Sequence, residues 1–199
     1  VNQQKKTEEI MEDSEYQGVR LSLDAYLDKT RIPLKIDIST GDVITPCEIS
    51  FSYQLMFENR TIPLLAYPPE TVLAEKLETI LSRGEANTRL RDFYDVYILQ
   101  REDFVVTPDA LCHALLATCR KRGHEDLLHT YASILDRVRQ SDTMRTQWMK
   151  YQSDFDYAAG ITWDTVLDTV ETLCMKTLDD HAFGDELPQE ESQFEMHLL

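Results

Sequence analysis

Residues 67–84 read YPPETVLAEKLETILSRG, and this stretch separates two kinds of sequence. Pro68 and Pro69 end an extended segment, and Pro69 suits the first position of a helix because its fixed φ is already helical. Gly84 is a typical helix stop, since glycine readily adopts the positive φ of a C-terminal cap. We therefore predict a helix from Pro69 to Arg83, with strands before it and further helices after it.

Residues 16–66, upstream of this boundary, are typical of strands. Apolar and polar side chains alternate at positions 19–24 and again at positions 32–38, which is the pattern of half-buried strands. A turn is indicated at Gly41, and residues 62–66 predict a short third strand. Two or three strands with no helix between them make a poor independent sheet, so we expect the sheet to continue upstream.

The remaining regions are assigned from composition and periodicity. Residues 1–15 are polar and charged, so we expect neither a strand nor a signal peptide there. Residues 67–178 predict a mainly helical domain, and the acidic residues 179–199 predict a disordered tail. The expected class is α+β, a partial sheet of two or three strands followed by helices. After the first helix, the expected helices cover about 89–101, 107–122, 126–139, 142–151 and 162–177.

Composition limits the function classes. The formal net charge of -16 argues against non-specific coating of DNA, because such a chain repels phosphate backbones at long range. No apolar run approaches the roughly 20 residues that a membrane span needs. The four cysteines show no metal-binding spacing, which favours reduced core residues in a cytoplasmic protein.

Lys76 falls inside the apolar stripe of the predicted first helix. At about 100° per residue, it shares an arc of about 140° with four apolar residues, whereas Glu75 and Glu78 occupy the side where a solvated lysine is expected. Burying an ammonium is costly unless it is paired or reaches a polar cleft. A functional or paired lysine and one that extends its ammonium out to solvent both remain open.

Asp92 and Asp95 lie on a predicted helix that is apolar nearly all round, residues 90–99, LRDFYDVYIL. Two carboxylates on a buried helix need cationic partners, and Lys76, Arg89 and Arg91 are the nearest in sequence. A purely structural ion pair between Lys76 and Asp95 explains the lysine and the aspartate together. A functional role for the same residues is the competing interpretation.

Asp37 is a candidate metal ligand on the predicted strand at positions 32–38. Its side chain lies on the face opposite the apolar residues of that strand. A carboxylate on a rigid strand is well placed for Mg²⁺, which prefers oxygen ligands in fixed geometry. The simpler interpretation is a solvated strand face that carries Asp37 beside Lys35.

Taken together, these segments resemble one family. Residues 67–78 (YPPETVLAEKLE) resemble the third motif of the abortive-infection AbiEii/AbiGii-type nucleotidyltransferase toxins, and residues 91–97 (RDFYDVY) are similar to their fourth motif. Residues 29–46 resemble the segment around the second motif, and residues 147–178 are similar to the C-terminal helices of the family. The resemblance covers residues 16–178.

The resemblance implies part of a polymerase-β-type nucleotidyltransferase sheet, an NTP substrate and Mg²⁺. It implies transfer of a nucleotidyl group to an acceptor such as RNA, with tRNA as a candidate, and a cognate antitoxin protein as partner. Carried over to this sequence, Asp37 is a metal-side carboxylate. Lys76, with Arg91 beside it, contacts the nucleotide phosphates. Asp92 or Asp95 is the essential acid, with Asp95 preferred.

One motif of the family has no counterpart here. The first motif is a Gly-Gly or Gly-Ser turn followed by an Asp-x-Asp strand, and nothing in residues 1–15 resembles it. Glu12 and Asp13 are no substitute, because neither a glycine turn nor a strand is expected before them. We therefore expect this chain to be inactive by itself, as a truncated or degenerate member of the family.

Two further interpretations compete with an enzyme. The helical region can be a catalytically dead protein–protein interaction module in which Lys76 and Asp95 form only an internal ion pair. A nucleic-acid-binding helical domain is the weaker alternative. Its one support is the basic run of residues 120–122, which is explained more simply by the dipole at a helix C-terminus.

Overall fold

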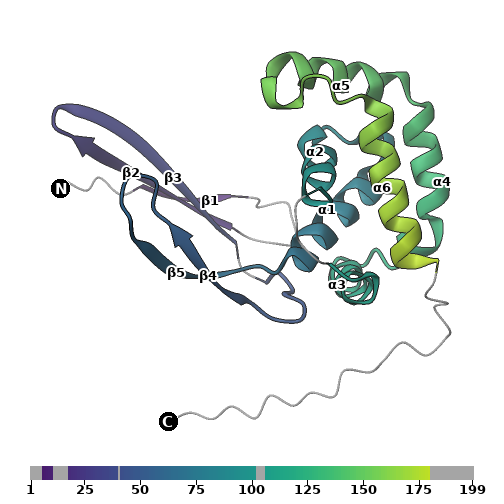
Figure 1. The fold of residues 1–199 in the computed structure, drawn as a ribbon, viewed down its shortest axis with the longest axis horizontal. Helices are drawn as coiled ribbons and strands as arrows, with labels where there is room; N and C mark the ends of the chain where they lie inside the picture. Colours follow the sequence, from purple (N-terminus) through teal and green to yellow (C-terminus); the bar gives the residue numbers. More distant parts are fainter. Residues whose placement is uncertain (1–5, 11–17, 40, 102–105, 180–199) are drawn as a thin grey trace, which may run out of the picture.

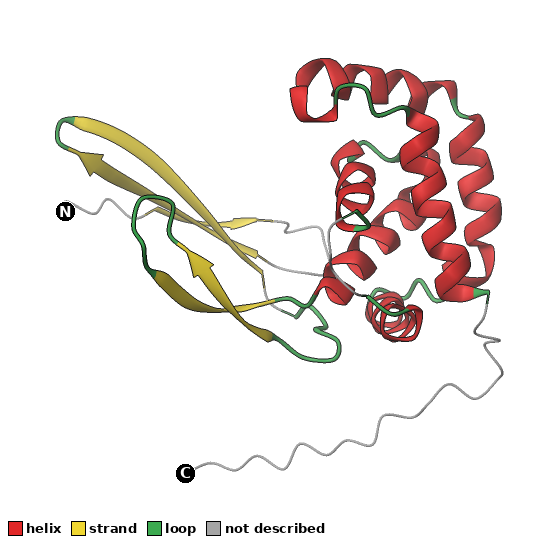
Figure 2. Ribbon diagram, viewed as in Figure 1, coloured by secondary structure: helices red, strands yellow, loops and turns green. Residues whose placement is uncertain are grey.

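The computed structural model describes residues 6–10, 18–39, 41–101 and 106–179. The strands precede the helices along the chain and occupy a separate part of the molecule, as Figure 1 shows. Figure 2 gives the same view by secondary structure, with the strands in yellow and the helices in red. The predicted α+β class is confirmed.

The strands form two antiparallel sheets among the described residues. One sheet has the order β1-β2-β3 and the other is the β4-β5 hairpin. Leu23 lies opposite Leu34 in the β2-β3 pair, and a positive φ of 53° at Asp28 closes the turn between these strands. The strands are β1 (Lys6–Ile10), β2 (Gly18–Leu27), β3 (Thr30–Ser39), β4 (Ile49–Gln54) and β5 (Thr61–Ala66).

Two strands correct the sequence-based expectation. No strand was expected in residues 1–15, yet β1 pairs there with β2. Main-chain hydrogen bonds hold such a strand in a ladder, so it needs no alternation of apolar side chains. Strand β4 was not predicted either, although Ile49, Phe51 and Tyr53 alternate with polar residues in the period expected of a strand.

The strand faces are more exposed than the alternating pattern predicts. On β3, Ile32, Leu34, Ile36 and Ile38 are between 41% and 47% exposed, and Phe51 on β4 is 48% exposed. The expectation of half-buried strands is therefore wrong for β3. The pattern reports which side chains share a face, whereas burial depends on what packs over that face.

The helices begin and end close to their predicted limits. Thr107 and Thr162 cap two of them by accepting hydrogen bonds from Ala110 N and Thr165 N. Gly84, with φ 49°, ends the first helix as predicted. The helices are α1 (Pro69–Arg83), α2 (Leu90–Leu99), α3 (Pro108–Lys121), α4 (Leu127–Gln140), α5 (Asp142–Asp154) and α6 (Trp163–Leu178), with short 3₁₀ turns at Gly84–Ala86 and Asp156–Ala158.

The hydrophobic core lies among the helices. Helix α1 packs against α2 and α3, and α6 packs against α2, α3 and α4. Phe93 and Trp163 meet at the centre with ring centroids 5.1 Å apart, and the indole N–H of Trp148 donates to Ile161 O at 2.8 Å. This core fixes the relative positions of α1 and α2, which carry the candidate site.

Two expectations concern the ends of the chain and membranes. None of the helices in the described ranges is long and apolar enough to cross a bilayer. The predicted disordered tail lies, apart from residue 179, outside the described residues.

Candidate functional site

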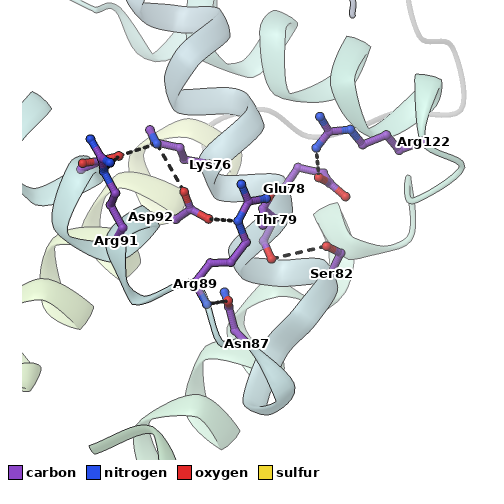
Figure 3. Close-up of polar contacts among 10 residues, drawn as sticks. Lys76, Glu78, Thr79, Ser82, Asn87, Arg89, Arg91, Asp92 and Arg122 are labelled. Atoms are coloured by element: carbon purple, nitrogen blue, oxygen red, sulfur yellow. Dashed lines mark hydrogen bonds and ion pairs between the residues drawn. The ribbon is translucent and has the colours of Figure 1, made fainter. Parts of the chain in front are cut away.

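The ammonium of Lys76 on α1 lies between two carboxylates of α2. Lys76 Nζ donates to Asp95 Oδ2 at 2.6 Å and to Asp92 Oδ1 at 3.3 Å, as Figure 3 shows for the labelled Asp92. The three side chains are 20%, 22% and 11% exposed for Lys76, Asp95 and Asp92. Of the two alternatives that the sequence left open for Lys76, the structure shows the paired lysine and not one that extends its ammonium into solvent.

Two arginines approach the same carboxylates from the start of α2. Arg89 Nε lies 3.6 Å from Asp92 Oδ2, and Arg91 Nε lies 3.7 Å from Asp95 Oδ2. Both distances exceed an ordinary hydrogen bond, and the two guanidinium side chains are 57% and 76% exposed. We call Lys76, Asp92 and Asp95 the Lys76 cluster. The guanidinium of Arg91 lies beside this cluster and is exposed to solvent.

The turn between α1 and α2 holds this arrangement. The buried Asn87 accepts a hydrogen bond from the backbone N–H of Arg89 at 2.7 Å, directly before α2 begins. A side-chain oxygen that bonds the backbone two residues on is the usual way in which asparagine fixes a tight turn. The turn brings the first residues of α2 back against the middle of α1, which places Asp92 opposite Lys76.

Lys76 and Asp92 line a cavity of about 870 Å³ at the junction of the strands and the helices. The end of β3, the segment before α1, one face of α1, the start of α2 and the segment after α3 all contribute to its wall. Four lysine and arginine side chains line it, namely Lys76, Arg83, Arg89 and Arg122. Arg83 makes no ion pair with any residue in the described ranges, so its charge is open to a ligand.

The segment after β3 is pinned to the start of α1 at the edge of this cavity. Thr45 N donates to Thr71 Oγ1 at 2.9 Å, and Thr71 Oγ1 donates in turn to Thr45 O at 3.0 Å. Asp42 Oδ2 accepts from the Tyr67 hydroxyl and from Ser39 Oγ, both at 3.0 Å. Burial first, and then the Asp42 carboxylate, raises the pKa of Tyr67 to about 12, so this hydroxyl remains a donor at neutral pH.

A second buried cluster of charged residues adjoins Lys76, and it was not predicted from the sequence. The Glu78 carboxylate is 3% exposed, accepts from the Arg122 guanidinium and lies 2.7 Å from Nδ1 of His124. Arg122 also approaches Glu75 at 3.8 Å. Glu78, Arg122 and His124 all line the cavity around Lys76, with Glu78 and Arg122 labelled in Figure 3.

The expectation that Glu78 faces solvent is wrong, because this residue is 2% exposed, and Thr71 on the same helix is 1% exposed. The periodicity of α1 identifies one apolar stripe, but the opposite face is covered by the chain that follows α3. Burial also raises the pKa of Glu75 on this face, and the nearby Asp42 carboxylate adds to the effect. No local pattern identifies the Glu78 and Arg122 pair, since 44 positions separate the two residues.

Asp37 lies away from this cluster, on β3. Both of its carboxylate oxygens accept from Arg20 on the neighbouring strand, at 2.6 and 2.7 Å. These hydrogen bonds from Arg20 lower the pKa of Asp37. Ser39, two residues further and therefore on the same face of β3, lines the cavity, whereas Asp37 does not.

The described residues do not complete a metal site. No group of three or more histidine, cysteine, aspartate or glutamate side chains within them is arranged to hold a metal ion. Asp37 contributes a single carboxylate that Arg20 already engages. A Mg²⁺ ion needs about six oxygen ligands in octahedral geometry, so these residues alone do not fit it.

Comparison with known proteins identifies a family. A family model described as the nucleotidyl transferase AbiEii toxin of a type IV toxin–antitoxin system matches residues 1–169. No curated protein and no solved structure matches the chain. The matched range contains all three residues of the Lys76 cluster, together with Asp37 and the Glu78 pair. The chain belongs to the AbiEii nucleotidyl transferase toxin family.

Proposed function

We propose that the cavity around Lys76 binds a nucleoside triphosphate and that the chain acts in transfer of its nucleotidyl group to an acceptor such as RNA. The observation that carries the proposal is the partly buried ammonium of Lys76, held between Asp92 and Asp95 at the wall of a cavity of about 870 Å³. Membership of a nucleotidyltransferase family supports the reaction class.

The wall of the cavity mixes cations and carboxylates. The four cations Lys76, Arg83, Arg89 and Arg122 line it together with Asp42, Glu75, Glu78 and Asp92. Arg83 makes no ion pair with the described residues, so a triphosphate would find this cation available. Phosphate oxygens accept charge-assisted hydrogen bonds from such side chains, which are roughly twice as strong as neutral ones. Lys76 is the proposed phosphate contact. Arg91 does not line this cavity but the neighbouring one, and its exposed guanidinium is a further proposed contact for a phosphate that reaches the start of α2.

Asp95 is our preferred essential acid, with Asp92 beside it. Lys76 donates to Asp95 over the shorter distance, so the ammonium and this carboxylate orient one another. When Lys76 turns to a phosphate, a free carboxylate at Asp92 or Asp95 can accept a proton from the attacking hydroxyl. Asp92 Oδ2 is buried and makes no hydrogen bond with the described residues; its nearest cation is Arg89 at 3.6 Å, so this contact would require only that loose ion pair to open.

The metal remains a separate part of the proposal. We assign Asp37 to the metal side of the reaction because it lies on β3, two residues before the cavity-lining Ser39. The described residues supply no complete metal site around it, so we derive no step through a metal ion. The same residues hold no Gly-Gly or Gly-Ser pair, and we expect residues 1–199 by themselves not to complete the transfer.

The partners follow from the family. A toxin of a toxin–antitoxin system implies a cognate antitoxin. We propose RNA, with tRNA as the first candidate, as the acceptor, and the cytoplasm as the place of action.

The test is expression of the natural gene in a bacterial host, followed by an assay of the purified protein with labelled NTPs and bacterial RNA. Where the gene product carries the Gly-Ser and Asp-x-Asp motif together with residues 1–199, we expect arrested growth and labelled RNA for the natural protein, and neither for Lys76→Met or Asp95→Asn. The matched control is Lys176→Met, which removes an exposed lysine that lines a different cavity. Labelled RNA from the Lys76→Met protein would refute the site assignment.

An interaction module is the second candidate, and one observation favours it. The module was expected in the helical region, whereas the exposed apolar face lies on β3. Its residues Ile32, Leu34, Ile36 and Ile38 are 41–47% exposed and share one strand face, as in a protein-binding surface. On this interpretation, Lys76 is only a structural cation. The natural protein would then arrest growth without labelling RNA, and Lys76→Met would keep that effect wherever it remained folded.

A further inference from the structure

A second cavity, of about 460 Å³, lies between the start of α2 and helix α5. It shares Arg89 and Asp92 with the cavity around Lys76, so the two cavities meet at the start of α2. Gln147 and Lys150 on α5, and Phe155 directly after this helix, form one wall of it, and none of them has a role in the site described above.

Its rim is basic. Arg89, Arg91 and Lys150 line it, and Lys150 makes no ion pair with any residue of the described chain. The ion pairs of Arg89 and Arg91 are loose, at 3.6 and 3.7 Å, and both guanidinium groups are more than half exposed. An anion at this rim would therefore gain three cationic contacts without breaking a tight ion pair.

Aromatic side chains form part of the wall of this cavity. Tyr151 and Phe155 line the cavity with ring centroids 4.7 Å apart. Tyr151 is braced from behind by Trp148, which stacks on it at 5.3 Å with an interplanar angle of 25°. The ring of Phe155 is 41% exposed, and exposed rings of this kind serve as stacking platforms for planar ligands such as nucleobases.

Two hydrogen-bond acceptors on its wall are unused. The side-chain atoms Gln147 Oε1 and Asp92 Oδ2 are both buried, and neither accepts a hydrogen bond from a described residue. Asp92 Oδ2 has only the loose ion pair with Arg89, at 3.6 Å. A buried acceptor without a donor is costly, and such atoms usually meet a ligand or a water. The ligand that fits this wall therefore carries donors, such as hydroxyl or amino groups.

We propose that this cavity is a binding subsite for one ribonucleotide, adjacent to the cavity around Lys76. A ribonucleotide has a group for each of the three parts of the cavity. Its phosphate can bind the basic rim, and its planar base can stack on the aromatic rings. Its ribose hydroxyls, or an amino group of the base, can donate to the two acceptors. The inference rests on the proposed function, because the neighbouring cavity is the proposed NTP site. The nucleotide can come from single-stranded RNA or from a free NTP.

The acidity of the chain does not oppose this assignment. At the cavity itself, three cations, Arg89, Arg91 and Lys150, meet the carboxylates of Asp92 and Asp154 on the wall and that of Asp95, which lies 3.7 Å from Arg91, so the local charge is balanced and not strongly acidic. Charges further away than about 8 Å are largely screened at physiological ionic strength, so the local balance governs binding.

The experiment measures binding, without catalysis. A labelled single-stranded RNA of roughly ten nucleotides, the DNA of the same sequence, and each free NTP are titrated against the purified protein at low salt, by anisotropy or calorimetry. The variants are Lys150→Glu and Phe155→Leu, both at exposed side chains. The control is Lys176→Glu, which makes the same change of charge in another cavity.

We expect Lys150→Glu to weaken binding of the nucleotide ligand by about tenfold and Phe155→Leu by about fivefold, with no change for the control. An effect on RNA assigns the subsite to the acceptor, and an effect on an NTP alone assigns it to the donor. If both variants bind RNA and NTPs as the natural protein does, or if DNA binds as tightly as RNA, the proposal is overturned.

This outcome is independent of the proposed function. If the natural protein transfers no nucleotide but its RNA or NTP binding depends on Lys150, the subsite stands and the enzymatic proposal fails. If transfer depends on Lys76 but neither ligand responds to Lys150→Glu, the enzymatic proposal stands and the subsite fails.

Discussion

Lys76 Nζ lies 2.6 Å from Asp95 Oδ2 and 3.3 Å from Asp92 Oδ1, so one ammonium from α1 serves two carboxylates of α2. A single cation shared by two acids is more adaptable than an isolated ion pair. It can release one carboxylate to a ligand while it keeps the other. This relationship connects the stability of the helix pair with the chemistry that we propose for the cavity.

The shared ammonium predicts a coupled effect on stability. Lys76→Met leaves two carboxylates side by side, with only the more distant Arg89 and Arg91 to balance them. We expect the free energy of unfolding to fall by about 1–3 kcal/mol. In a double-mutant cycle with Asp95→Asn, measured by urea unfolding, the two effects should be non-additive by about 1 kcal/mol. Simple addition of the two would show that the pair is not coupled.

Substitution of the buried Glu78 should lower the free energy of unfolding more than substitution of a residue in a surface ion pair. Glu78→Gln removes the charge that Arg122 and His124 both engage, at a side chain that is 3% exposed. We expect a loss of about 2 kcal/mol in the free energy of unfolding. The matched control is Glu125→Gln, which breaks an exposed pair with Arg120 and should cost under about 0.5 kcal/mol. Equal losses for the two variants would contradict a structural role for Glu78.

Glu75 predicts a pH-dependent gain in stability on substitution. Burial, and then repulsion by Asp42, raises the pKa of Glu75 in the folded protein. The folded state therefore binds this proton more readily than the unfolded chain, so the ionised carboxylate destabilises the fold at neutral pH. Glu75→Gln should raise the free energy of unfolding at about pH 8, and the gain should shrink as the pH falls toward the ordinary glutamate range. Urea unfolding at several pH values measures this, and a loss of stability at about pH 8 would reverse the assignment.

The four cysteines predict selective labelling. Cys47 is exposed, whereas Cys112, Cys119 and Cys174 are buried, and all four are free thiols. Burial raises the pKa of Cys119 and of Cys174 to about 12, and only a thiolate reacts quickly with alkylating agents. Iodoacetamide on the native protein should give a single adduct in the intact mass spectrum, which Cys47→Ser abolishes. Rapid addition of two or more adducts would show that the helical core opens.

The Lys76 cluster was predictable from the sequence because its evidence is local. A lysine in an apolar stripe and two aspartates on an apolar helix each need a partner, and α1 and α2 are joined by a short turn that makes them neighbours. The helix limits were predictable for a similar reason. Residues such as Pro69, Gly84 and Thr107 act on the backbone directly beside them.

The remaining features depend on contacts between distant residues. Glu78 and Arg122 are 44 positions apart, and no periodicity in α1 indicates which segment covers its second face. The Asp37 pair with Arg20 needs the register of β2 against β3, which the alternating pattern alone does not specify. Strand β1 forms through main-chain pairing, so its polar sequence gave no pattern to recognise.

Titration of each NTP against the purified protein tests the central claim most directly, with the natural protein compared with Lys76→Met and with the matched control Lys176→Met. We predict that Lys76→Met weakens NTP binding by about tenfold while the control binds as the natural protein does, because Lys76 alone of these two lines the proposed nucleotide cavity. Circular dichroism checks that each variant is folded. Unchanged NTP binding by a folded Lys76→Met protein, or no binding by the natural protein, would contradict the account.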